Sequence, residues 1–270
     1  MGRPSIAIVV TYFGRPPFWL PAFLLSCRKN PDVRWLLYSD FEAMPDLPAN
    51  VTLKHLTMRG LYERAADVLG TRVDKKPTLR KSCDFKPTYG VIFAEDLKPF
   101  DFWAHSDLDI IWGDVRQFLT EDLLVDHDIV SSAVGKIAGH FTLFRNTEGT
   151  NRTFELIPHV TDELSNRKYR HLDEDVITEH LREKVNATPR GLWPRVYWRE
   201  DLTVSSTYQK ALGDSERDSL WWRNGKTFDA NGHELMYLHF HKLKPFMKAI
   251  NFGPGDSPAA FSIDRRGLLA

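Results

Sequence analysis

The sequence has two aspartates one residue apart at the end of a strongly apolar run, FWAHSDLDIIWGD at 102–114. Two carboxylates at this spacing can hold a hard divalent cation such as Mg²⁺ or Mn²⁺, and substrate phosphates often complete the coordination shell. The same spacing occurs again at 126–128 and at 173–175. Spacing alone therefore does not separate a metal site from a polar turn.

Position along the chain favours the first pair, Asp107 and Asp109, as the metal site. Alternate side chains of an extended segment point the same way, so Asp107 and Asp109 can face one cation while Leu108 points into the core. They follow a strand, and open α/β sheets bind ligands beyond the carboxyl ends of their strands. The pair at 173–175 opens a predicted helix, and the pair at 126–128 precedes a strand and predicts a turn.

A second cluster lies in LHFHKLKPF at 238–246. If this segment is a strand, His239 and His241 share one face and the apolar residues the other. With Lys242 and Lys244, the histidines are typical of a corner that binds metal and anions, although a solvated strand face would give the same pattern.

The elements that must position these residues alternate between strand and helix. Continuous apolar or β-branched runs predict strands at 5–12, 33–40, 51–57, 100–107, 128–134, 141–146 and 234–246, the last of them running into a basic turn. Helices are predicted from near Pro17, over 83–97 and over 173–185. Strands buried on both faces and separated by helices predict an α/β fold with a mostly parallel central sheet flanked by helices.

Composition narrows the function. The chain has 270 residues, 42% of them hydrophobic, and 36 basic residues balance 36 acidic ones, so no global charge favours nucleic acid or a membrane surface. Two cysteines give neither a disulfide framework nor zinc spacing. With no secretion signal and no apolar run of about 20 residues, we expect a cytoplasmic protein, free or peripheral to the inner face of the membrane. One domain over 1–250 and a loop-like tail over 251–270 are predicted.

Four segments together carry a resemblance: CDFKPTYGVIF, HSDLDIIWGD, GHFTLFRN and HFHKLKPF. The sequence resembles GT-A-type glycosyltransferases, nucleotide-diphospho-sugar transferases, and most closely a bacterial group of uncharacterised GT-A-like proteins associated with surface-polysaccharide genes. The likeness covers most of residues 5–245 and is specific around the Asp-x-Asp motif. It departs from the pattern in the late segment, where His241 and Lys242 replace a glycine-containing part and Phe246 replaces a tryptophan.

The resemblance implies a GT-A-like fold and transfer of a sugar from a nucleotide-diphosphate sugar, with a uridine diphosphate sugar as the expected donor. The acceptor would be a carbohydrate or glycolipid of surface-polysaccharide synthesis. Asp107 and Asp109 would hold Mn²⁺ or Mg²⁺, with His239 as a further ligand and His241 as its competitor. The donor-binding residues implied are Thr11, Tyr12 and Asp40 for the nucleoside, Asp84 and Lys86 for the ribose and donor sugar, and Lys244 for the diphosphate.

The acceptor side is less defined by motifs. An inverting transfer needs a base, and Asp173 and Glu174 are the candidates, with helix capping as the alternative. His140 could bind a sugar or be a satisfied histidine in a buried turn, and Gly139 before it would allow close backbone approach. Tryptophans within 193–222 could stack on acceptor sugars or belong to the core.

Two other classes of protein remain open on the sequence. A metal-dependent phosphatase or phosphotransferase also uses Asp-x-Asp after a strand, although its nucleophile normally lies near the chain start. A non-catalytic protein that binds nucleotide sugars or carbohydrates would keep the donor pocket and lack the base.

Overall fold

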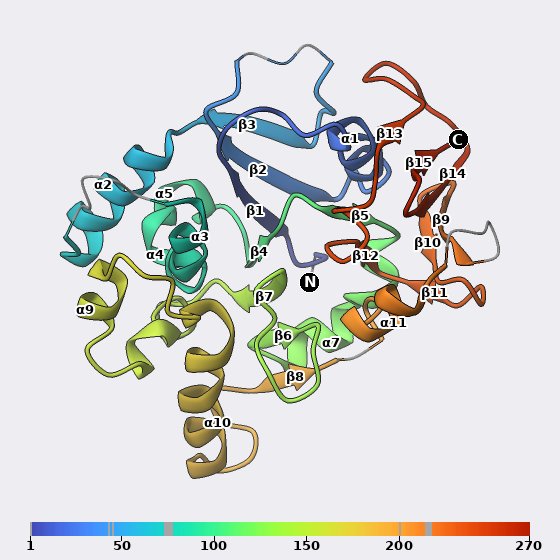
Figure 1. Cartoon of the computed structure of the whole chain (residues 1–270). Helices are drawn as coiled ribbons and strands as arrows, with labels where there is room; N and C mark the ends of the chain where they lie inside the picture. The colour runs from blue at the N-terminus through green and yellow to red at the C-terminus, as the bar shows by residue number, and fades with distance from the viewer. Residues whose placement is uncertain (1, 43, 45, 73–77, 200, 214–217) are drawn as a thin grey trace.

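The computed structural model describes residues 2–42, 44, 46–72, 78–199, 201–213 and 218–270. A large twisted sheet crosses the middle of the molecule, helices lie around it, and a smaller sheet lies at one side (Figure 1). Within the described residues, no helix combines the length and the apolar character needed to cross a membrane.

The central sheet has seven strands in the order β3-β2-β1-β4-β7-β6-β8. Parallel pairing joins β3, β2, β1 and β4, and β6 with β8, whereas β7 is antiparallel to both of its neighbours. The predicted α/β class with a mostly parallel sheet is therefore confirmed. The strands are β1 (Ile6–Tyr12), β2 (Val33–Ser39), β3 (Val51–His55), β4 (Phe102–Ser106), β6 (Ile129–Ser131), β7 (Phe141–Arg145) and β8 (Val196–Trp198).

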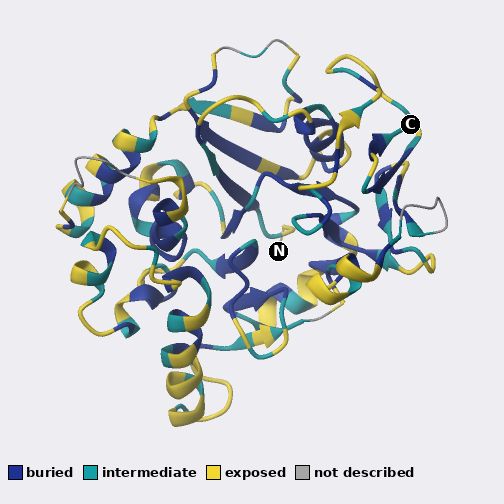
Figure 2. Cartoon of the chain, viewed as in Figure 1, coloured by how far each residue is buried: buried dark blue, intermediate teal, exposed yellow. Residues whose placement is uncertain are grey.

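Side chains of β1 alternate between two apolar clusters. Ile6 and Ile8 pack in a cluster with Phe23 of α1, whereas Ala7 packs in a cluster with Leu61 of α2. Both faces of the sheet are therefore buried, which explains the continuous apolar run in this strand. Figure 2 shows the central strands as largely buried.

The helices are mostly short. The longer ones are α1 (Leu20–Arg28), α2 (Met58–Leu69) and α10 (Ile177–Ala187). Short α-helices are α3 (Leu79–Ser82), α4 (Tyr89–Ile92), α5 (Ala94–Leu97), α6 (Val115–Phe118), α7 (Glu121–Asp126), α8 (Glu148–Asn151), α9 (Val160–Ser165) and α11 (Ser206–Ala211). The turns η1 (Cys83–Thr88) and η2 (Thr153–Leu156) are 3₁₀-helical, and η3 (Leu172–Val176) is a π-helical turn.

The second sheet has six strands in the order β11-β10-β9-β14-β15-β13. They are β9 (Leu220–Arg223), β10 (Lys226–Phe228), β11 (Glu234–Leu235), β13 (Ala249–Ile250), β14 (Ala260–Asp264) and β15 (Gly267–Leu269). Phe261 and Leu268 are buried in one cluster with Trp19 of the first half of the chain. The predicted loop-like tail is therefore wrong for β14 and β15, because these short strands gain their stability from that distant contact.

A two-stranded ribbon carries the late part of the chain to the carboxyl end of β4. In it β5 (Ile110–Trp112) pairs antiparallel with β12 (Tyr237–His239), and His239 stands opposite Ile110. The strand running into a basic turn that is predicted over 234–246 is found, but the strand ends at His239, so His241 lies in the turn and not on the strand. The turn includes Lys244, whose N–H donates to the carbonyl of Phe240 over 2.9 Å.

Candidate functional site

Asp107 and Asp109 lie in the short connection between β4 and β5. The backbone N–H of Asp107 donates to the carbonyl of His140 over 3.1 Å, and the carbonyl of Asp109 accepts from the N–H of Phe240 over 3.2 Å. Leu108 between them is 4% exposed and packs in the core. The connection is thus fixed on both sides, and the two carboxylates point to one region, as the alternation predicted.

His239 completes a group of three metal-binding side chains, because the ribbon places it beside the residue that follows Asp109. Its Nε2 lies 3.5 Å from Oδ1 of Asp109 and 3.8 Å from Oδ2 of Asp107. One ligand atom from each residue lies within 4.8 Å of the others. Nε2 of His239 is buried and has no hydrogen-bond partner among the described residues, so the donor set fits a divalent cation.

Two lysines neutralise the aspartates. Nζ of Lys86 lies 2.5 Å from Oδ1 of Asp107 and also donates to the carbonyl of Gly139 over 2.7 Å. Nζ of Lys244 lies 2.7 Å from Oδ2 of Asp109. Burial alone would raise the pKa of the Asp109 carboxyl, but the charges of His239 and Lys244 hold it well below its usual range. Each aspartate of the site is thus paired with a lysine before any ligand binds.

Three histidine rings stack behind the aspartates. His239 lies in the middle, with its ring centroid 4.3 Å from that of His140 and 4.3 Å from that of His241. Burial lowers the pKa of His140 well below its usual value, and burial with the charge of His239 lowers that of His241 to about 4. His241 bonds through Nε2 to the hydroxyl of Ser206 at 3.2 Å, so His239 is the better placed of the two to bind a cation.

Asp173 and Glu174 are in the π-helical turn η3, pressed against Gly139. A Cβ at Gly139 would lie 2.7 Å from Oδ2 of Asp173 and 2.8 Å from Oε1 of Glu174, so a side chain there would displace these two carboxylates. Asp173 is 2% exposed, and Tyr169 donates its hydroxyl to Oδ1 over 2.7 Å. Burial raises the pKa of Asp173 to about 6, although Lys86, with Nζ 3.9 Å from Oδ2, opposes the rise.

Asp84 lies behind the site rather than in it. It is fully buried, and Lys81 donates to its Oδ2 over 2.7 Å. The backbone N–H groups of Arg170 and Leu172 also donate to its carboxylate, over 2.8 and 2.9 Å. These contacts anchor the segment that leads into η3, and Asp84 lines neither cavity of the site.

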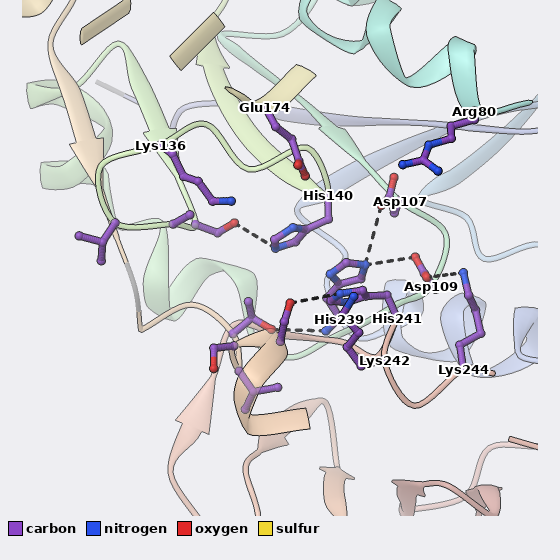
Figure 3. A pocket seen from close by; sticks show the side chains of 17 residues that line it. Arg80, Asp107, Asp109, Lys136, His140, Glu174, His239, His241, Lys242 and Lys244 are labelled. Atoms are coloured by element: carbon purple, nitrogen blue, oxygen red, sulfur yellow. Dashed lines mark hydrogen bonds and ion pairs between the residues drawn. The ribbon is translucent and has the colours of Figure 1, made fainter. Parts of the chain in front are cut away.

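Two cavities meet at the aspartates (Figure 3 shows the larger). The larger has a volume of about 1160 Å³ and the smaller about 330 Å³. Both are lined by Arg80, Asp107, Asp109 and Lys244. Any ligand that spans the two cavities therefore passes the candidate metal group.

The remaining predicted residues divide between these cavities. Thr11 and Tyr12 line the smaller one, with Lys86, and His140 and Glu174 line the larger. Asp40 lines neither; its carboxylate accepts from the N–H of Gly14 over 2.8 Å. The tryptophans at 193, 198, 221 and 222 do not line the larger cavity, and Trp222 is fully buried.

Sequence reasoning missed Arg80 and Lys136, which line the larger cavity. Arg80 lies in the polar, basic segment 70–81, whose composition is typical of an exposed loop. Residues 73–77 of this segment lie outside the described part, and Leu79–Ser82 form α3. Lys136 lies between β6 and β7 and carries no motif. A role for Arg80 and Lys136 could not be inferred from their charge alone, because only the folded structure places both residues in the lining of one cavity.

Residues 8–263 match a family of unknown function, DUF6625. No curated protein matches the sequence. Among solved structures, similarity is found to an active-site mutant of LgtC (10% identity, 87% of each chain covered, TM-score 0.46). It is also found to galactosyltransferase LgtC in complex with donor and acceptor sugar analogues (10% identity, 87% of each chain, TM-score 0.40). Mouse xyloside xylosyltransferase 1 in its apo form is a third (8% identity, 87% of this chain and 97% of that chain, TM-score 0.46).

Proposed function

The chain belongs to the DUF6625 family, whose function is unknown, and we propose that it is a metal-dependent glycosyltransferase. It transfers a sugar from a nucleotide-diphosphate sugar to a carbohydrate or glycolipid acceptor, as part of surface-polysaccharide synthesis. The observation that carries the proposal is the convergence of Asp107, Asp109 and His239 with two lysines where two cavities meet.

Asp107, Asp109 and His239 are the residues that would hold the cation. Two carboxylate oxygens and one imidazole nitrogen suit Mn²⁺ well, and Mg²⁺ is the alternative. A divalent cation bound there would offset the negative charge that a departing diphosphate acquires.

Lysines of the site bind the diphosphate. Lys244 lines both cavities and Lys86 lines the smaller, so their ammonium groups can reach phosphate oxygens at the junction. Both are held in place by aspartates, and a fixed positive charge in a partly buried site stabilises developing negative charge more than a mobile one does. Arg80 adds a third cation at the same junction.

The smaller cavity is assigned to the nucleoside. Thr11 and Tyr12 at the end of β1 line it, and Trp19 offers an aromatic face. The side chain of Thr11 is fixed by a 2.8 Å hydrogen bond to the hydroxyl of Tyr89. Uridine is the expected base, and the direct donor contacts expected of Asp40 and Asp84 remain predictions.

Glu174 is the better placed of the two candidate bases, because it lines the larger cavity whereas Asp173 is buried behind it. In an inverting transfer, Glu174 accepts the proton of the acceptor hydroxyl. Asp173 acts through its neighbours: it lies near Lys86 and holds η3 against Gly139.

A thermal-shift and turnover panel tests this function. Wild-type protein and Asp109→Ala are melted with Mn²⁺ and UDP-, GDP-, CMP- and dTDP-sugars, and release of nucleotide is followed without acceptor. We expect one nucleotide class to raise the Tm of the wild type in the presence of Mn²⁺, with slow metal-dependent hydrolysis of that donor. Stabilisation without turnover would favour a non-catalytic binding protein, and turnover of simple phosphate esters instead would favour a phosphatase. If no nucleotide sugar stabilises the protein, the proposal fails.

A further inference from the structure

The larger cavity extends well past the aspartates. Figure 3 shows Asp109, Lys244 and Arg80 to the right of the His140 ring, and Lys136 to its left. Lys242 lies below the rings of His239 and His241. At about 1160 Å³, the cavity has room for more than a single sugar. Lys136 and Lys242 line the larger cavity and not the smaller one, to which the nucleoside is assigned.

Lysines in the two parts differ in their partners. Near the aspartates, Lys86 is paired with Asp107 and Lys244 with Asp109. The ammonium groups of Lys136 and Lys242 form no ion pair or hydrogen bond with any residue in the described part of the chain. They are therefore free to bind a ligand.

Other charges of the cavity do not cancel these two. The lining carboxylates are Asp107, Asp109 and Glu174, and the first two are assigned to the cation. Among the described lining residues, Glu174 is the one carboxylate left to offset Lys136 and Lys242, so this part of the cavity carries net positive charge.

We propose that Lys136 and Lys242 form an acceptor subsite that selects an acidic glycan, one bearing carboxylate or phosphate groups. Lys136 comes from the connection between β6 and β7, and Lys242 from the turn after β12, so each contacts a different part of the acceptor. The acceptor hydroxyl is thereby presented to Glu174 and the junction with the donor cavity. This inference rests on the proposed function, because the bound glycan is an acceptor only if the protein is a glycosyltransferase.

The test measures binding of matched probes to the full chain by calorimetry, with Mn²⁺ and UDP at saturation so that the donor side is filled. One pair is an oligogalacturonate and its methyl ester of equal length; the second is a phosphorylated mannan oligosaccharide and its dephosphorylated form. We expect one acidic probe to bind on the order of tenfold more tightly than its neutral partner, as for charge-assisted hydrogen bonds. Whichever pair shows the difference identifies carboxylate or phosphate as the group recognised.

Variants locate the effect. Lys136→Gln and Lys242→Gln should each weaken binding of the acidic probe several-fold and leave the neutral probe unchanged, whereas Lys136→Arg should retain most of the affinity. The control is Lys98→Gln, an exposed lysine far from either cavity lining, which should change neither. The inference is overturned if no pair shows a charge preference, if the lysine variants weaken both probes equally, or if UDP competes with the acidic probe.

Donor hydrolysis is measured on the same samples without glycan. If the donor is hydrolysed but no glycan pair shows a charge preference, the proposed anionic subsite is rejected and the proposed transferase function is retained. If binding depends on charge and on both lysines but no donor is hydrolysed, the anionic subsite is retained and the proposed transferase function is rejected.

Discussion

Two acidic pairs with the same spacing, 107–109 and 126–128, have opposite surroundings. Asp128 is 6% exposed, and its carboxylate is enclosed by Arg145 and Arg195, with the Arg195 N–H also donating over 3.0 Å. Asp107 and Asp109 are paired with lysines and open onto two cavities. The carboxylate of Asp128 is fully engaged in structural contacts, whereas Asp107 and Asp109 keep oxygen atoms available for a ligand.

The difference lies in the cations as much as in the carboxylates. An arginine meets a carboxylate through several fixed N–H groups and occupies both oxygens, as Arg195 does with Asp128 over 2.8 and 3.1 Å. A lysine is a point charge that contacts one oxygen, as Lys244 does with Oδ2 of Asp109. Arginine-paired aspartates are therefore structural in this chain, and lysine-paired ones at a cavity are candidates for function.

The largest effect is expected for Asp109→Ala. It removes a ligand atom from the candidate metal group, so we expect loss of Mn²⁺-dependent stabilisation and a fall in transfer of at least about 10³-fold, the upper range for losing one electrostatic contact in an active site. Calorimetric Mn²⁺ titration and turnover with saturating donor measure it. If Asp109→Ala binds Mn²⁺ as tightly as the wild type, the pair 107–109 is no more a metal site than the pair 126–128.

The third acidic pair sharpens the comparison through pH. The pKa of Asp173 is raised by burial from 3.8 to about 6, so the folded state holds this proton more tightly than the unfolded chain does. The penalty for its charge is absent below pH 4, grows as the pH rises and is complete above about pH 6, where it amounts to about 3 kcal/mol.

Relative to Asp173→Asn, wild-type protein should therefore lose stability between about pH 4 and pH 6. Urea unfolding of both proteins in EDTA measures the change, and a difference independent of pH would contradict the assignment. Asp175→Asn, at an exposed position of the same turn, is the matched control.

A smaller loss, of stability alone, is expected for Asp128→Ala. It leaves two partly exposed arginines and the Arg195 N–H without their acceptor, which costs about 2 kcal/mol after allowing for solvent at the arginines. Unfolding measures this cost, while the Mn²⁺ affinity should stay at the wild-type value. A large drop in metal affinity with intact folding would mean that the second pair also serves the site.

The smallest effect is expected for Asp126→Asn. Asp126 is exposed at the end of α7, and no described residue forms an ion pair with it. Stability should change by less than about 0.5 kcal/mol and metal affinity not at all. Its behaviour sets the baseline against which the other acidic variants are judged.

Local patterns were enough to predict much of the fold. Runs such as IAIVVTY in β1 are buried on both faces, so their composition reports strand and sheet type directly. Alternation likewise predicted that Asp107 and Asp109 point together. The resemblance supplied His239, and the β5–β12 register supplies the physical reason for its place there.

Contacts between distant segments were beyond such patterns. Lys81 and Asp84 have the spacing of a surface ion pair on a helix, yet both are buried because Asp84 binds backbone groups of a segment 86 positions later. The sequence analysis missed β14 and β15, although β14 is as long as β4. Their buried residues pack in a cluster that includes Trp19, which is distant in the sequence. Lys136 could be recognised as a cavity residue only from the position of its loop, which depends on the folded sheet.

The β5–β12 ribbon also has a consequence for how the protein is made. Asp109 and Lys244 are 135 positions apart, and His239 reaches the aspartates only when β12 pairs with β5. During synthesis the two aspartates emerge long before their histidine, so a nascent chain lacks the complete ligand set until β12 has left the ribosome. Pairing over such a separation is slow compared with local folding, and capture of a cation would then favour the finished chain over its partly folded forms.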